Sequence, residues 1–255
     1  MTDQYQLLTD SQWQVISTHL QTRARWRRLE LRSVVTAILY KLKTGCQWRF
    51  LPRDLPCWQS VSYYFYRWRK GGLIESLNGR ANELDRQTAG KEPHPSVLSI
   101  DSQSVKLGQR INEHRGTDGG KKVNGRKRHI AADTDGRVHC AHVTAADVHD
   151  SKAALPMLIK LPRQRLELMV GDSAYNGIFH RACLEAGLRF ELGSRPESSQ
   201  GFVPVSKRWP VERTFAWMNF YRQLNHDFCF NPDCHAAWIM LFNIAVCLKR
   251  LTNSS

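Results

Sequence analysis

The chain has 255 residues, of which 42% are hydrophobic and 24% are charged, an ordinary mixture for a globular protein. Its formal net charge is +14, because 37 Lys and Arg residues outnumber 23 Asp and Glu residues. These values exclude a fibrous or wholly disordered chain, and a basic surface of this size favours a polyanion such as nucleic acid as the partner.

The N-terminal part of the chain, residues 1–90, is predicted to be a small helical domain. Thr9 and the two residues after it are suitable caps for a first helix with apolar residues at helical spacing. An apolar stripe over residues 34–42 predicts a second helix that ends at Gly45. A third helix is expected from Trp58 to Lys70.

The third predicted helix has an apolar back and a basic, aromatic front. One face carries Trp58, Val61, Phe65 and Trp68, and the other faces carry Tyr63, Tyr66, Arg67 and Lys70. A helix, a short link and a basic helix resemble a helix-turn-helix, whose second helix enters the major groove. We therefore predict DNA binding through Arg67 and Lys70, with a small bundle of solvated cations as the alternative.

A composition typical of a linker, at residues 88–95, separates this part from residues 91–255, which we predict to be a second domain. Strands are predicted at 97–105, 126–133, 138–145, 166–172 and 189–192, and helices at 150–161, 179–186, 210–223 and 234–251. Three strands, then helix, strand, helix, strand and helix predict an α/β fold with a mixed sheet and flanking helices. This is the element order of a ribonuclease H-like fold.

Three acidic residues stand at positions that suit a metal site. Asp101 lies in the middle of the first strand, Asp172 closes the fourth, and Glu212 lies in the first turn of a later helix. In the ribonuclease H-like order the first and fourth strands are neighbours, so the two aspartates would lie side by side. Carboxylate oxygens are the ligands that Mg²⁺ and Mn²⁺ prefer, and two such ions can support phosphodiester displacement.

A basic segment follows Asp101. Residues 106–128 hold eight basic and two acidic residues together with several glycines, which predicts a mobile loop. We expect this loop to hold DNA phosphates through Lys121, Lys122, Arg126 and Lys127. The alternative is a charged loop that is merely solvated.

Neither a membrane segment nor a disulfide framework is predicted. The longest apolar run, Ala236 to Leu248, is too short to span a bilayer, and no secretory signal is visible. The seven cysteines are scattered and odd in number, which favours reduced thiols in a cytoplasmic protein.

Two of the cysteines, Cys229 and Cys234, lie near His226 and His235 and raise the question of zinc. Their spacing matches no standard zinc finger, and Asn231–Pro232 predicts a turn before a helix. The sequence therefore favours a turn over a zinc site.

Four stretches of the sequence form a specific set when they are taken in order. They are TGCQWRFLP at 44–52 with Trp58 and Trp68, IDSQSVK at 100–106, GRKRHI with DTDG between 125 and 136, and GDSAYNG at 171–177 with VERTFAW at 211–217. Together they resemble the bacterial insertion-sequence DDE transposases, in the branch with a short N-terminal helical domain. The resemblance extends over about residues 5–230.

The resemblance implies that Asp101, Asp172 and Glu212 are the catalytic triad and hold two Mg²⁺ or Mn²⁺ ions. It implies a transposase that binds the terminal inverted repeats of an insertion sequence and catalyses metal-dependent DNA cleavage and strand transfer into target DNA. Because two ends must be joined, the active complex would be at least a homodimer, in the bacterial cytoplasm and at the nucleoid.

The helix that carries Glu212 also supplies expected phosphate contacts. Arg208 matches the arginine that the family has four residues before the glutamate, and Arg213 follows it directly. The wider superfamily's tyrosine and second basic residue are replaced by Val205 and Asn219, which leaves the triad intact but changes these accessory contacts.

Two other functions share these features. A metal-dependent nuclease would hydrolyse DNA without strand transfer, and a non-catalytic regulator would only bind it. The predicted DNA-binding helices favour a transposase over the nuclease. The clustered carboxylates count against the regulator, because they repel phosphate and a pure binder has no use for them.

Overall fold

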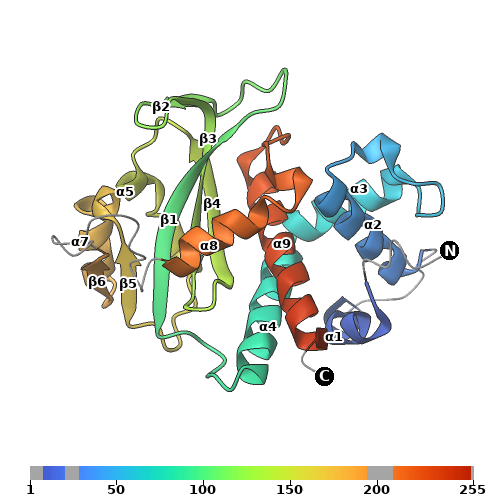
Figure 1. Ribbon diagram of the computed structural model, residues 1–255, viewed down its shortest axis with the longest axis horizontal. Coiled ribbons are helices and arrows are strands. Elements are labelled where there is room, and N and C mark those ends of the chain that lie inside the picture. The colour runs from blue at the N-terminus through green and yellow to red at the C-terminus, as the bar shows by residue number, and fades with distance from the viewer. Residues whose placement is uncertain (1–7, 21–28, 194–208, 254–255) are drawn as a thin grey trace.

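The computed structural model describes residues 8–20, 29–193 and 209–253 (Figure 1). Four helices precede the sheet: α1 (Asp10–Leu20), α2 (Leu31–Thr44), α3 (Trp58–Lys70) and α4 (Leu73–Thr88), with a 3-10 turn at Trp48–Phe50. The hydroxyl of Thr9 accepts from the backbone N–H of Gln12, and Gly45 ends α2 in the left-handed region at φ 67°. The first three helices therefore lie where the sequence predicts them.

A mixed sheet forms the centre of the molecule. Its strands are β1 (Val97–Lys106), β2 (Gly116–Asp118), β3 (Val123–Ala132), β4 (Val138–Ala145), β5 (Leu168–Gly171) and β6 (Arg189–Leu192). β3 is antiparallel to β1, β2 and β4, whereas β1, β5 and β6 run parallel to one another. This arrangement confirms the expected ribonuclease H-like fold class.

Helices cover both faces of the sheet. One face packs against α5 (Asp150–Ala153), α6 (Met157–Lys160) and α7 (Ile178–Glu185), around a core that includes Leu98, Ile100 and Met169. The other face packs against α4, α8 (Trp209–Met218) and α9 (Pro232–Asn253), around a core that includes Ile130, Ala141 and Phe215. In Figure 1, α8 crosses in front of β1, and α4 and α9 lie next to the sheet.

Two local expectations are wrong. The single helix predicted at 150–161 is divided into α5 and α6 by a turn, because Pro156 has no N–H to donate within a helix. The segment predicted as a loop over 106–128 is partly ordered by pairing, since β1 and β3 continue into it and β2 pairs with the first residues of β3.

The N-terminal helices and the last helix share one hydrophobic core. Phe65 of α3 stacks on Trp238 of α9, with ring centres 4.4 Å apart. Asn243 of α9 donates to the side-chain oxygens of Asn78 and Asn82 on α4, and its own oxygen accepts from the backbone N–H of Val138. The two-domain division at about residue 90 stays a prediction, and this shared core predicts that the two parts unfold together.

The last helix, α9, is long and apolar enough to be compared with a membrane span. Within the described residues, Pro232–Thr252 is the one helix that meets this criterion, and 67% of its apolar window is buried inside the protein. Its apolar side chains, among them Trp238, Ile239 and Phe242, belong to the core. The composition of α9 is therefore explained by packing against α4 and the sheet.

Candidate active site and nucleic-acid interface

Asp101 and Asp172 lie level with each other on two neighbouring parallel strands. Ser99 of β1 pairs with Val170 of β5, and each aspartate follows two residues later in extended backbone. Met169 packs into the core under α5–α7, so Asp172, which is three residues further on, faces the other side. Paired positions of parallel strands face the same way, and the two carboxylates therefore share the side that α8 covers.

The contacts of Gln103 on β1 confirm that Asp101 faces α8. Gln103, two residues after Asp101, accepts hydrogen bonds from Arg128 of β3. The guanidinium of Arg128 lies 5.8 Å from the ring centre of Phe215 on α8. Asp101 thus points to the α8 side of β1, and it is half-buried there.

The carboxylates of the two aspartates affect the buried hydroxyl of Tyr175. Tyr175, three residues after Asp172, is fully buried in the turn that follows β5. Burial raises the pKa of the Tyr175 hydroxyl well above its ordinary value, and the carboxylates of Asp150, Asp101 and Asp172 raise it further.

Glu212 lies on the exposed side of α8, in its first turn. The opposite side of the helix is fixed to the sheet by buried Val211, Phe215 and Met218. The hydroxyl of Thr214 donates to the carbonyl of Gly136 at 2.9 Å, which fastens α8 to the turn between β3 and β4. The helix packs against β1 and β3, with its first turn beside β1 in Figure 1.

The three carboxylates do not form one compact cluster in the described residues. The one group of three potential ligands whose atoms all lie within 4.8 Å of one another is elsewhere, at the start of α9. A site for two ions does not need such a compact group. Each ligand oxygen lies about 2.1 Å from its ion, and the two ions lie about 4 Å apart. Two ligand oxygens on different ions can therefore be about 8 Å from one another. The triad stays a prediction, supported by the register of β1 and β5.

Arg213, next to Glu212, is held between two aromatic rings. Its guanidinium lies 4.4 Å from the ring centre of Trp209 and 4.6 Å from that of Trp217. Burial lowers the pKa of Arg213, and the neighbouring Arg250 lowers it further. The side chain remains partly exposed, so its role at phosphate stays a prediction. Arg208 and Val205 lie outside the described residues.

The basic segment after β1 contains two exposed lysines. The ammonium of Lys121 donates at 3.3 Å to the carbonyl oxygen of Ser102, the residue that follows Asp101. Asp118 orders the turn by accepting from the N–H groups of Gly120 and Lys121. Lys122 is exposed, and the predicted phosphate contacts of both lysines are compatible with this placement.

The other two predicted contacts of this segment, Arg126 and Lys127, have structural roles instead. Arg126 is fully buried, 2.7 Å from Asp227, and it also donates to three carbonyl oxygens. Lys127 is buried and lies 2.7 Å from Asp150. Because β3 extends through both positions, their side chains point into the protein, and we exclude them from the predicted phosphate contacts.

The outer face of α3 presents aromatic and basic side chains together. Tyr63 and Tyr66 are 57% and 46% exposed, although large aromatic side chains are usually buried. Arg67 is exposed and donates to the Tyr63 hydroxyl at 3.2 Å, and Lys70 is exposed at the end of the helix. Val61 and Phe65 are buried on the inner face, as the helical spacing predicts. Cations and exposed rings on one face suit contacts to DNA.

Comparison with known families gives one match for the helical part and one for the α/β part. Residues 8–78 match the model of a putative transposase of the IS4/5 family, and residues 92–248 match the transposase DDE domain. The second match alone extends over more than half of the chain. The chain belongs to the DDE transposase family.

Among curated proteins, this DDE transposase is similar to a putative transposase for insertion sequence element IS402 from Burkholderia cepacia. The two are 30% identical over 137 residues, which are 50% of this chain and 64% of the relative. The chain therefore spans less than two thirds of the relative that it matches. No solved structure matches the chain. The DDE domain is the catalytic domain of an enzyme family, which agrees with the expected enzyme class.

Proposed function

We propose that this DDE transposase binds the terminal inverted repeats of an insertion sequence and catalyses cleavage and strand transfer of DNA. The observation that carries the proposal is the level placement of Asp101 and Asp172 on two parallel strands, of which β1 packs against α8, the helix that carries Glu212. These residues offer only carboxylate oxygens, the donor set that fits Mg²⁺ or Mn²⁺. When bound, two such ions would polarise the scissile phosphate and the attacking oxygen.

In this proposal the chain's own residues position the reacting DNA. Asp101 and Asp172 are held by strand pairing, and Glu212 is held by the anchored helix α8, so the metal ligands are set on rigid elements. Lys121 and Lys122 would neutralise phosphates next to β1. Water would be the first attacking group, and the freed 3′ hydroxyl the second, in the same site. At least two chains would be needed to hold two element ends.

The test is an assay of the full-length protein on linear DNA that carries the sequences flanking its coding region. With Mg²⁺ we expect nicked ends with free 3′ hydroxyls and joined products, and with a chelator neither. Cleavage without joined products would favour the nuclease, and binding without cleavage in Mg²⁺ or Mn²⁺ would favour the regulator. Each alternative therefore has its own product pattern.

The outer face of α3 is expected to supply part of the affinity for DNA. Changing Arg67 and Lys70 together to Ala removes two exposed cations and leaves the buried face of α3 intact. The slope of log affinity against log salt should become shallower by about 1.8, or about 0.9 for each lost phosphate contact on duplex DNA. Electrophoretic mobility shifts at several salt concentrations measure this.

A matched control is the double change of Arg163 and Arg165 to Ala. Both arginines are exposed, in the connection between α6 and β5, and neither belongs to α3. This variant has the same net charge as the α3 variant, and its salt slope should stay at the wild-type value. Equal slopes for the two variants would remove α3 from the DNA interface.

A further inference from the structure

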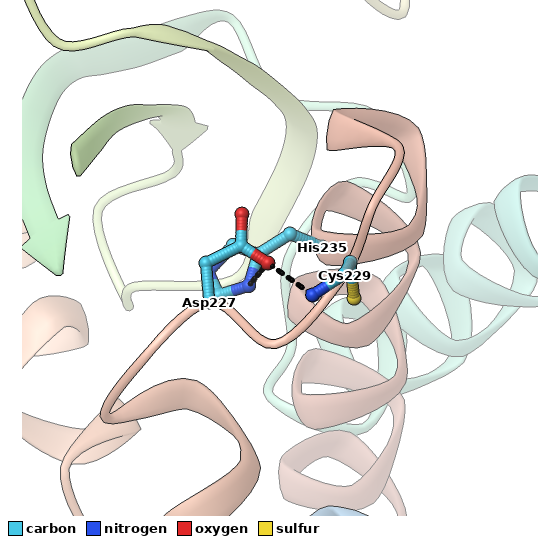
Figure 2. Close-up of side chains that lie close together, drawn as sticks. All are labelled: Asp227, Cys229 and His235. Atoms are coloured by element: carbon cyan, nitrogen blue, oxygen red, sulfur yellow. Dashed lines mark hydrogen bonds and ion pairs between the residues drawn. The ribbon is translucent and has the colours of Figure 1, made fainter. Parts of the chain in front are cut away.

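A compact group of metal-ligand side chains lies at the start of α9, in a region the proposed catalytic function does not use. Asp227, Cys229 and His235 each offer one ligand atom, and these atoms all lie within 4.8 Å of one another (Figure 2). Asp227 and His235 are fully buried and Cys229 is half-buried. The residues come from the segment before α9 and from the first turn of the helix.

The imidazole of His235 is the strongest sign that a ligand is missing. The ring is 0% exposed, and neither of its nitrogens has a hydrogen-bond partner among the described residues. Its Nδ1 lies 3.3 Å from Oδ1 of Asp227, but it is not aligned to donate to that oxygen. A buried ring without a hydrogen bond is rare and costly, and an ion between the ring and the carboxylate would give a ring nitrogen a partner.

Cys234 provides a fourth donor next to this group. It is buried in the first turn of α9, directly before His235, and lies outside the set of three whose ligand atoms are all within 4.8 Å of one another. Two sulfurs, one imidazole nitrogen and one carboxylate oxygen are a tetrahedral donor set for Zn²⁺. Bonds of about 2.0–2.3 Å to Zn²⁺ place neighbouring ligand atoms about 3.3–3.8 Å apart, and the separation between Asp227 and His235 is already at that value.

The charges around the group also fit a divalent ion. Arg126 donates to Oδ2 of Asp227 at 2.7 Å, and Oδ1, which accepts from the backbone N–H of Cys229 at 2.8 Å, lies 3.3 Å from Nδ1 of His235. The carboxylate and two thiolates carry three negative charges, which Zn²⁺ and the guanidinium of Arg126 would balance. Arg126 also donates to the carbonyl oxygens of Cys229 and Phe230, so it fixes the backbone on which the ligands stand.

We propose that Asp227, Cys229 and His235, with Cys234 as the fourth donor, form a structural Zn²⁺ site that is separate from the carboxylate triad. The site ties α9 to the end of β1, because the backbone N–H of Asp227 donates to the carbonyl of Lys106 and its carbonyl accepts from Gly108. Zn²⁺ bound here would therefore stabilise the strand that carries Asp101, without taking part in the reaction.

The experiment measures metal content and coordination in the full-length protein. After exposure to Zn²⁺ and gel filtration in excess Mg²⁺, we expect one Zn²⁺ for each chain by elemental analysis. Replacement by Co²⁺ should give the intense visible bands of a tetrahedral site and near-ultraviolet bands of thiolate ligation. Cys229→Ser and His235→Gln should lower the affinity for Zn²⁺ by at least about 100-fold, because each removes a direct ligand.

Two control variants separate this site from other thiols and from the triad. Cys57→Ser changes an exposed cysteine and should keep the full Zn²⁺ content. Asp101→Asn should also keep it while losing DNA cleavage, so failure of the zinc proposal and failure of the catalytic proposal give different results. Loss of Zn²⁺ in either control would overturn the assignment.

A measurement on the unaltered protein keeps the proposal testable if the ligand variants do not fold. Bound Zn²⁺ should protect Cys229 and Cys234 from alkylation, as read by mass spectrometry, and should leave the exposed Cys57 reactive. The midpoint of thermal unfolding should rise with free Zn²⁺, because only the folded chain assembles the site. No Zn²⁺ retention, equal alkylation with and without Zn²⁺, or a disulfide between Cys229 and Cys234 would each overturn the proposal.

Discussion

Changing Asp101 to Asn should reduce DNA cleavage by about 10³-fold or more while DNA binding stays within a few-fold of the wild type. The neutral amide holds Mg²⁺ poorly, and the loss of several kcal/mol of metal-based stabilisation corresponds to a change of this size. Binding should persist because affinity for DNA comes mainly from Lys and Arg contacts to phosphate. Asp172→Asn and Glu212→Gln should behave in the same way.

The measurement is the rate of end cleavage on labelled DNA, together with a mobility shift on the same DNA. Glu185→Gln is the control, because Glu185 is an exposed acid at the end of α7, on the opposite face of the sheet from α8. This variant should cleave at the wild-type rate. A triad variant that cleaves at a near-normal rate would remove that residue from the active site.

Changing Arg137 to Met should lower the free energy of unfolding by about 3–5 kcal/mol, the usual cost of breaking a buried ion pair. Arg137 is 2% exposed, and its guanidinium lies 2.6 Å from Asp85 on α4 and 3.3 Å from Asp133 at the end of β3. Burial opposes the charge of Asp133, but His139 and Arg137 hold its pKa well below the ordinary value. Methionine would leave the buried carboxylates of Asp85 and Asp133 without the positive charge of Arg137.

Denaturation by urea measures this loss, and Arg80→Met is the control. Arg80 pairs with Glu83 at 3.0 Å on the exposed side of α4, where such a pair contributes less than about 1 kcal/mol. Because the N-terminal helices, α9 and the sheet share one hydrophobic core, both variants should still unfold in one transition. A small effect in Arg137→Met, or separate transitions for the helices and the sheet, would contradict the shared core.

Periodicity explains why the elements were largely predictable from the amino-acid sequence. The apolar spacing of α2 and α3 and the alternation along β1 and β4 reflect local geometry, which each segment carries within itself. The order of those elements then restricts the topology, and the ribonuclease H-like order made β1 and β5 expected neighbours, as the structure has them. The approach of Asp101 to Asp172 could be predicted for the same reason.

What the sequence could not determine is which charged residues are exposed. Arg126 and Lys127 look like Lys121 and Lys122 in composition, yet the continuation of β3 buries the first two and leaves the lysines in solvent. Burial of a charge depends on whether a partner is available to compensate it. For Arg126 that partner is Asp227, which is 101 residues away in the chain.

The proposed zinc ligands at the start of α9 were likewise determined partly by the sequence and partly by the tertiary structure. The sequence determined that Cys229, Cys234 and His235 are close in the chain, but their spacing matched no zinc finger. The tertiary structure alone decided that Asp227 joins Cys229 and His235 within ligand distance. A ligand set depends on the direction of side chains in space, and here that direction is fixed by Arg126 and by the backbone pairing of Asp227 with β1.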